Sequence, residues 1–166
     1  SMKKLEQTPG FLSSLLESIT ERIVVVDPQD YKILYANRAF QATYGQPLVK
    51  LLGKTCYEVT HRKDQPCHLT ETDCPVKNAF ETGNPSSTVH AHVDKVGNRE
   101  YVRLNAYPIR NPDGNITGVV EASTDITAEM NLQEELRRKS ELFEKILTTS
   151  PDGIIGNDGM GNIFLF

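Results

Sequence analysis

Tryptophan is absent from this sequence of 166 residues, and cysteine occurs only three times. A small, odd number of cysteines argues against the paired disulfides of a secreted framework, so we expect thiols or metal ligands in a reducing compartment, the cytoplasm. Long apolar runs are also missing, because a run such as Ile23–Val26 is far too short to cross a membrane. The N-terminus has no basic-then-apolar export signal, so the sequence predicts neither export nor membrane contact.

A strong charge of either sign is missing as well. The 18 basic and 22 acidic residues leave a net charge of -4, which predicts no nonspecific binding to nucleic acid or to an anionic membrane. Apolar residues make up 38% and charged residues 24% of the chain, as in a soluble globular protein. At this length one ordinary domain can bury a core that needs neither disulfides nor metals.

The sequence contains an internal repeat. Residues 15–27 and 146–158 share one pattern, in which the end of a helix is followed by a polar turn, an apolar strand and an aspartate. Both copies continue with a second apolar strand, at 32–35 and 162–165. Such a repeat predicts a tandem array of domains, and a chance match of two hairpins is the alternative. Because the second copy includes only its first hairpin, we expect this chain to be a fragment of a longer protein.

Apolar periodicity and turn residues predict two strands, then several short helices, then three strands. The expected strands lie at 23–27, 32–36, 86–95, 99–110 and 116–125, and the expected helices at 11–19, 37–44, 48–52, 54–59, 75–82 and 128–148. Asn37 is suited to cap a helix, and Gly45 and Gly83 are suited to end one. An α+β fold satisfies this order, with an antiparallel sheet covered by helices on one face.

The last expected helix, at 128–148, is long and polar. Its surface carries three favourable i,i+4 charge pairs, Glu134/Arg138, Glu135/Lys139 and Glu141/Lys145. Leu132, Leu136, Phe143 and Ile146 follow the seam spacing of a coiled coil, which a lysine interrupts once. The pattern predicts a homodimer through this helix, and the alternative is a helix that packs on its own domain.

With this element order, the sequence resembles the PAS (sensory box) family over residues 11–127. The resemblance lies in the hairpin and helix at 23–40, in Tyr44-Gly45, in the last hairpin at 107–118 and in the ending Asp125-Ile126-Thr127. It implies a five-stranded antiparallel sheet whose helical face can enclose a small-molecule ligand. It also implies a sensor or dimerisation module upstream of another domain, often a histidine kinase.

The resemblance suggests how the chain is divided. We expect a lead-in with a tag scar (1–10), a PAS domain (11–127), a signalling helix (128–148) and the truncated start of a second PAS domain (149–166). A ligand, a redox change or a metal at the helical face would favour one arrangement of the sheet and so shift the signalling helix. The full protein would be a sensor kinase or a transcriptional regulator. The alternative is a PAS module that senses nothing and carries a structural zinc.

Four candidate metal ligands lie within 19 residues: Cys56, His61, Cys67 and Cys74. Three thiolates and one imidazole suit a tetrahedral zinc ion. The spacing, Cys-x4-His-x5-Cys-x6-Cys, is not that of a standard zinc finger. A Cys67–Cys74 disulfide and three free thiols remain open alternatives.

Flavin is a second cofactor to consider, because Gly53-Lys54-Thr55-Cys56 has the Gly-x-x-Cys spacing of the light-sensing PAS branch. In that branch the cysteine adds to the flavin. Here Thr55 replaces an asparagine, and Tyr57-Glu58-Val59 replaces Arg-Phe-Leu. Val102 and Ser123 would face the flavin ring without the amides that its buried polar edge needs. We therefore expect no flavin.

Haem is not expected either, because the helix at 75–82, where the resemblance would place an axial ligand, has no histidine. His61 or His68 could serve only in principle. His90 and His92 alternate on one strand and share a face of the sheet. We interpret them as a solvated or sheet-covering pair.

Catalytic motifs are not visible, so we expect no enzyme activity from this chain. Gly159-Met160-Gly161 fits a hairpin turn rather than a phosphate loop. Alternation along the strand at 99–110 places Val102 and Leu104 on one face and Arg103 on the other. Arg103 could bind a carboxylate ligand as a fork, but an exposed arginine is the simpler interpretation.

Overall fold

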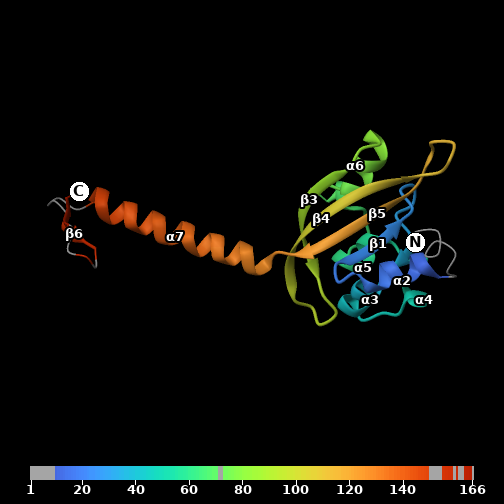
Figure 1. Cartoon of the computed structure of the whole chain (residues 1–166), viewed down its shortest axis with the longest axis horizontal. Helices are drawn as coiled ribbons and strands as arrows, with labels where there is room; N and C mark the ends of the chain where they lie inside the picture. The colour runs from blue at the N-terminus through green and yellow to red at the C-terminus, as the bar shows by residue number, and fades with distance from the viewer. Residues whose placement is uncertain (1–9, 71–72, 150–154, 159, 161–162, 166) are drawn as a thin grey trace, which may run out of the picture. The chain divides into compact units, whose positions relative to one another are not determined.

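Alternating apolar residues build the sheet in the computed structural model, which describes residues 10–70, 73–149, 155–158, 160 and 163–165. The strands are β1 (Arg22–Val26), β2 (Ile33–Ala36), β3 (Ser86–Val93), β4 (Arg99–Arg110) and β5 (Ile116–Asp125). They form one antiparallel sheet in the order β2-β1-β5-β4-β3 (Figure 1). The predicted sheet is therefore confirmed. The proposed tag scar at Ser1 lies outside the described residues.

Short helices supply the other half of the core. They are α2 (Phe11–Ser18), α3 (Arg38–Tyr44), α4 (Leu48–Leu51), α5 (Cys56–His61), the 3-10 turn η1 (Cys67–Leu69) and α6 (Pro75–Thr82). Phe40 of α3 and Val76 of α6 join Val24 and Val119 of the sheet in one buried cluster. The helices from α3 to α6 therefore bury the same face of the sheet, which we call the inner face.

Capping residues fix where these helices begin and end. The Asn37 carboxamide oxygen accepts hydrogen bonds from the backbone N–H groups of Phe40 (3.1 Å) and Ile23 (3.0 Å). Its amide nitrogen donates to three carbonyls of the preceding segment, those of Leu16, Ile19 and Glu21. Gly45 and Gly83 end α3 and α6 in the left-handed conformation, at φ 65° and 67°. All three predicted caps are confirmed.

The two faces of the sheet carry different residues. Val102 and Leu104 of β4 are buried, and Tyr101 is 41% exposed. Arg103 is exposed on the outer face, so the ligand role considered for it has no support. His90 and His92 are only 2% and 1% exposed on the inner face. The expectation of a solvated or sheet-covering pair is therefore wrong, because the helices enclose both rings.

The helix α7 (Thr127–Thr149) follows β5 directly. Two of its expected ion pairs are present, Glu134/Arg138 at 3.1 Å and Glu135/Lys139 at 2.7 Å. Glu141 pairs instead with Arg137, at 2.7 Å. No helix in the described ranges is long and apolar enough to span a bilayer.

The described residues divide into a unit that ends at Thr127 and a second unit that begins at Ala128. In the second unit, β6 (Ile155–Asn157) and β7 (Ile163–Leu165) pair as an antiparallel hairpin. This hairpin is the one predicted from the internal repeat. The interpretation of 149–166 as the start of a second PAS domain stays a prediction.

Candidate functional site

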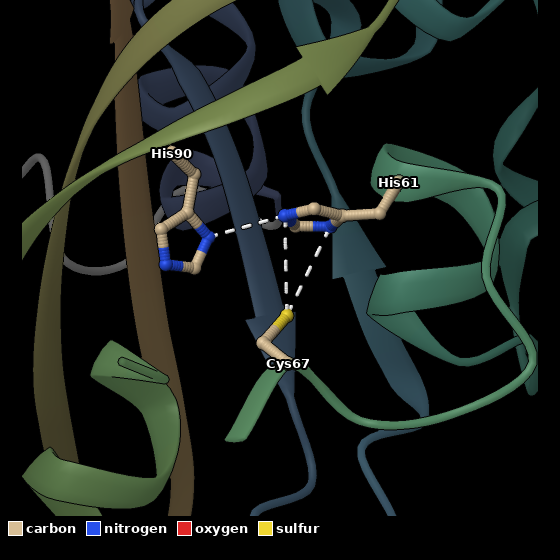
Figure 2. A group of neighbouring side chains, drawn as sticks. All are labelled: His61, Cys67 and His90. Atoms are coloured by element: carbon tan, nitrogen blue, oxygen red, sulfur yellow. Dashed lines mark hydrogen bonds between the residues drawn. The ribbon is translucent and has the colours of Figure 1, made fainter. Parts of the chain in front are cut away.

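Three side chains from separate elements meet on the inner face (Figure 2). His61 lies at the end of α5, Cys67 begins η1, and His90 lies on β3. One ligand atom from each lies within 4.8 Å of the others. His61 Nε2 is 3.1 Å from His90 Nδ1, and Cys67 Sγ is 3.9 Å from both ring nitrogens of His61. This spacing is that of a small metal-ligand set.

Local structure positions each member of this cluster. α5 ends at Arg62, a non-glycine residue at φ 53°, so the chain turns back after His61. The Arg62 guanidinium donates to the Asp94 carbonyl at 2.7 Å, which fastens the end of α5 beside the end of β3. Within η1, the backbone N–H and the hydroxyl of Thr70 both donate to the Cys67 carbonyl. These bonds hold His61 and Cys67 opposite β3.

The predicted metal ligands are only partly brought together. His61 and Cys67 lie in the cluster, and the Cys74 thiol hydrogen-bonds with that of Cys67. Cys56 is buried at the start of α5 and does not belong to the group of converging ligand atoms. His90, the third member of the cluster, is not among the residues predicted from the sequence. The sequence does show that His90 alternates with His92 on one strand. That alternation indicates a site residue once it is known which face of the sheet the helices cover.

The three described cysteines are free thiols, so the structure does not contain the Cys67–Cys74 disulfide. Their hydrogen bond lowers the pKa of Cys74 to about 7 and raises that of Cys67. Burial raises the pKa of the Cys56 thiol well above its ordinary value. Cys74 is thus the most reactive of the three, since only the thiolate is a nucleophile or a metal ligand.

The histidines of the inner face are held neutral by burial. Burial, with smaller contributions from His90 and Lys63, lowers the pKa of His61 to about 3. Burial also lowers the pKa values of His90 and His92. Neutral imidazoles offer lone pairs, so this group is set up to accept a proton donor or a metal rather than to carry charge.

His92 extends the cluster toward α3. Its Nδ1 lies 2.9 Å from the Tyr44 hydroxyl, and its ring centroid is 4.5 Å from that of His61. Its Nε2 is buried without a hydrogen-bond partner. A buried nitrogen in this state costs free energy, so it marks a place where a group from outside the described chain could bind.

A polar cleft of about 220 Å³ opens between α3, α5 and the end of β3. Its lining includes the charged residues Lys54, Glu58, Arg62, Asp94 and Lys95, with the ring of Tyr44 as part of its wall. The cleft therefore offers both positive and negative side chains to a small polar molecule. Tyr44 belongs to both the cleft and the histidine cluster, so the two places are in contact.

A polar network connects Tyr44 to the start of α7. Arg22 of β1 forms an ion pair with Glu100 of β4 and interacts electrostatically with Tyr44. Asp125, the last residue of β5, interacts with both Arg22 and Glu100. The Asp125 carboxylate accepts hydrogen bonds from the backbone N–H (2.9 Å) and the hydroxyl (2.6 Å) of Thr127, the first residue of α7.

The sheet order, the helices on one face and the long helix after β5 define the PAS class of domain. The family model for the PAS fold matches residues 16–131, and the chain belongs to this family. This match confirms the resemblance found in the sequence. Domains of this class are sensory.

Curated relatives share most of this chain but are much longer. A blue-light-activated histidine kinase of Brucella ovis is 26% identical over 137 residues, which cover 81% of this chain and 27% of the relative. The kinase of the same name from Brucella canis is 24% identical over the same shares. The chain thus spans about a quarter of the length of these relatives.

Solved structures show the same fold. An RNA-binding light-oxygen-voltage receptor superposes with a TM-score of 0.68 at 21% identity, covering 84% of this chain and 38% of that one. A PAS domain from Colwellia psychrerythraea gives a TM-score of 0.59 at 20% identity, covering 77% and 99%. At these identities the likeness concerns the fold.

The residues that argued against flavin are placed on the inner face as expected. Val102 is fully buried, and Ser123, 4% exposed, donates a long hydrogen bond (3.5 Å) to the Arg22 carbonyl. Neither side chain offers an amide to a ring. The expectations that this chain binds neither flavin nor haem stay predictions.

Proposed function

We propose that this chain is the sensor module of a longer signal-transduction protein and passes a change at its helical face into α7. Membership of the PAS family supports a sensory role, and the relatives named as histidine kinases support a kinase as the output. The same names give no support to the alternative of a non-sensing spacer with a structural zinc.

The observation that carries this proposal is the polar network from Tyr44 through Arg22, Glu100 and Asp125 to Thr127. At one end, Tyr44 contacts the cleft and the histidine cluster. At the other end, the network caps the first turn of α7. Electrostatically coupled polar groups therefore lie between the place where a ligand would bind and the element that leaves the domain.

The start of α7 is also tied to the middle of the sheet. The Thr127 hydroxyl accepts a hydrogen bond from the Tyr101 backbone N–H at 2.9 Å, and the Ile126 N–H donates to the Tyr101 carbonyl at 2.8 Å. Ile126 is 3% exposed. A shift of β4 or β5 must therefore move the first turn of α7 or break these bonds.

Signalling by this route requires two arrangements of the network with different affinities for the stimulus. A ligand in the cleft that displaced Tyr44 would change its electrostatic interaction with Arg22, and the Arg22–Glu100 pair would then reorganise against Asp125. The cap of α7 would then weaken, because Asp125 is the acceptor for both Thr127 donors.

The test measures phosphate incorporation from ATP into the full-length protein, with Thr127→Ala against wild type. Loss of the Thr127 hydroxyl removes its bonds to Asp125 and Tyr101, so we expect the basal rate to change by about fivefold, the effect of roughly 1 kcal/mol. Thr117→Ala, at an exposed threonine on β5, is the control and should change the rate by less than about twofold.

Two results would count against the proposal separately. A wild-type protein that incorporates no phosphate would refute the kinase output. A folded Thr127→Ala protein with an unchanged rate would refute the route through the network.

A further inference from the structure

We propose that His61, Cys67 and His90 bind a divalent transition-metal ion, zinc, which fastens α5 and η1 to β3. The set differs from the one predicted in the sequence, since His90 replaces Cys56 and the ligands come from three elements. The site does not depend on the signalling role proposed above, and its test can fail while the kinase test succeeds.

The distances fit one small ion. Around a tetrahedral zinc, Zn–N bonds of about 2.0–2.1 Å and a Zn–S bond of about 2.3 Å place two nitrogens roughly 3.3 Å apart and nitrogen and sulfur roughly 3.6 Å apart. The corresponding separations are 3.1 Å between His61 Nε2 and His90 Nδ1, and 3.9 Å between Cys67 Sγ and His61 Nε2. The third pair, Cys67 Sγ and the His90 nitrogen, lies within 4.8 Å, and Sγ is equally far from both His61 nitrogens. The Cys67 side chain must therefore swing toward the space between the two imidazoles for one ion to reach all three ligands.

The hydrogen bonds around the cluster fix one lone pair, at His90 Nδ1, and leave two proton arrangements open for His61. His90 Nε2 lies 2.5 Å from the Asp73 carbonyl, which can only accept, so Nε2 carries the proton and Nδ1 has a lone pair. The single hydroxyl proton of Thr60 has two acceptors within reach, the Cys56 carbonyl at 2.9 Å and His61 Nδ1 at 2.7 Å. It can serve only one of them.

A metal ion favours the arrangement in which Thr60 donates to the Cys56 carbonyl. If Thr60 donates to the Cys56 carbonyl, His61 Nδ1–H donates to the Thr60 oxygen, and His61 Nε2 presents a lone pair toward that of His90 Nδ1. A cation between the two lone pairs satisfies every donor and acceptor of the set. Without it, His61 Nε2–H donates to His90 Nδ1 and Thr60 donates to His61 Nδ1, so the metal-free set gives up the bond from Thr60 to the Cys56 carbonyl.

Metal binding then has a defined proton balance. The His61 proton moves from Nε2 to Nδ1, so the imidazole stays neutral. The Cys67 thiol loses its proton to solvent, and the thiolate binds the ion. The bonds from His90 to Asp73 and from His61 to Thr60 hold the rings in orientation, as outer-shell partners do at known sites.

The chemistry of the donors selects the class of metal. Two imidazoles and one thiolate suit zinc and its neighbours in the first transition row, whereas calcium and magnesium prefer oxygen ligands. Two buried neighbours outside the converging group could supply a fourth ligand if their side chains moved toward it. The unpartnered His92 Nε2 belongs to a ring that packs against His61, and the Cys74 thiol hydrogen-bonds with Cys67.

The first experiment titrates the metal-free 166-residue chain with cobalt(II) as a spectroscopic substitute, then with zinc in competition. We expect about one ion per chain and a thiolate-to-cobalt absorption band. Cys67→Ser should abolish that band, and His90→Gln should weaken zinc binding by about a hundredfold or more, since even outer-shell changes cost 10–100-fold.

Matched controls separate this set from the one predicted in the sequence. His68→Gln removes a histidine of the same loop, and Cys56→Ser removes a thiol of the same helix. Both should retain the affinity within about threefold, because neither residue belongs to the converging ligand atoms. Loss of binding in Cys56→Ser with normal binding in His90→Gln would overturn the assignment.

X-ray absorption at the zinc edge of the wild-type protein reads the ligands without a mutation, so the proposal stays testable if His90→Gln fails to fold. One sulfur with three nitrogens would support the site with His92 as the fourth ligand. Two sulfurs with two nitrogens would support it with Cys74. A spectrum with no sulfur, or a chain that retains no stoichiometric metal, would overturn it.

Discussion

Glu121 is the single carboxyl group that β5 buries against the helices, among the residues described. Its side chain is 6% exposed on the inner face, where it pairs across the sheet with Val24 and Ala106. Burial, with a smaller contribution from Cys74, raises its pKa to about 8. A carboxyl group in this position is protonated when folded and ionised when unfolded over most of the neutral range.

The pH dependence of stability follows from this shift. Between the unfolded pKa of about 4.5 and the folded value of about 8, the folded protein binds one proton more than the unfolded chain. The free energy of unfolding therefore falls as the pH rises through this window, by an amount of order a few kcal/mol. The stabilising contribution is complete below the window and is lost above it.

Glu121→Gln should remove this dependence, because an amide of the same shape does not titrate. We expect the variant to be more stable than wild type at pH 8 by a few kcal/mol and to differ little at pH 5. Urea unfolding at the two pH values measures the difference. Glu58→Gln, at an exposed position on α5, is the control and should leave the pH dependence unchanged. Equal pH slopes for Glu121→Gln and wild type would contradict the buried-acid interpretation.

At the residue scale, the sequence predicts local roles well and non-local ones poorly. Asn37, Gly45 and Gly83 are recognisable because a cap depends on neighbours within one turn. His90 is not recognisable as a site residue, because its partner His61 lies 29 positions away and reaches it only after β3 is covered by α5. Two of the four predicted ligands, His61 and Cys67, lie together because they are close in sequence as well as in space. The metal itself stays a prediction.

At the element scale, the one shifted helix has a physical cause. The sequence predicts a helix at 54–59, but α5 begins two residues later, at Cys56. The Lys54 carbonyl accepts a hydrogen bond from the Ile33 N–H at 2.8 Å, and Thr55 forms an isolated bridge with Lys32. These contacts at the start of β2 hold residues 54–55 extended. The local sequence does not predict them, because they join positions more than 20 residues apart.

For β3, by contrast, the local sequence does indicate where the strand ends. β3 is predicted to reach residue 95 but ends at Val93, because Asp94 begins the turn. The Asp94 carboxylate accepts hydrogen bonds from the backbone N–H groups of Val96 (2.9 Å) and Asn98 (2.8 Å). An aspartate ahead of a Gly-Asn pair is a recognisable turn residue.

The apolar stripe of α7 predicts that two copies of the chain associate through this helix. Leu136 is 61% exposed in the single chain, although it lies on the seam with Leu132. If two copies pair through this seam, Leu136→Asp would place a charge at the interface and should weaken the dimer by at least about tenfold. Sedimentation equilibrium measures the dissociation constant.

Leu142→Asp is the matched control on the same helix. Leu142 is 60% exposed but lies off the seam, so the same substitution should weaken the dimer clearly less. Equal effects of the two variants would show that the helix does not pair through this stripe, and a monomeric wild-type chain would contradict the dimer outright.

At the scale of the whole molecule, the buried residues of the described chain all lie before Thr127. The last of them is Ile126, and the stretch of α7 from Ala128 to Thr149 contributes none. The polar network and the histidine cluster also end at or before Thr127. The unit up to Thr127 thus contains the core, the proposed metal site and the connection to α7, whereas the second unit supplies the surface expected to associate.

This division predicts how a truncated chain behaves. A chain that ends at Gln133 keeps Thr127 and the first turn of α7 but loses most of the seam, so we expect its thermal midpoint at low concentration to match that of the full chain. The full chain, if it dimerises through α7, should gain stability as its concentration rises, because association shifts unfolding by mass action. The truncated chain should not.

Circular dichroism melts at two protein concentrations, tenfold or more apart, separate these expectations. A rise of the midpoint with concentration in the full chain, and none in the truncated chain, assigns the association to α7 and the fold to the unit before it. A large loss of stability in the truncated chain at low concentration would instead show that the core depends on residues beyond the first turn of α7. That result would also undermine the proposed route of the signal, because a helix that holds the domain together cannot at the same time be the element that the domain moves at low energetic cost.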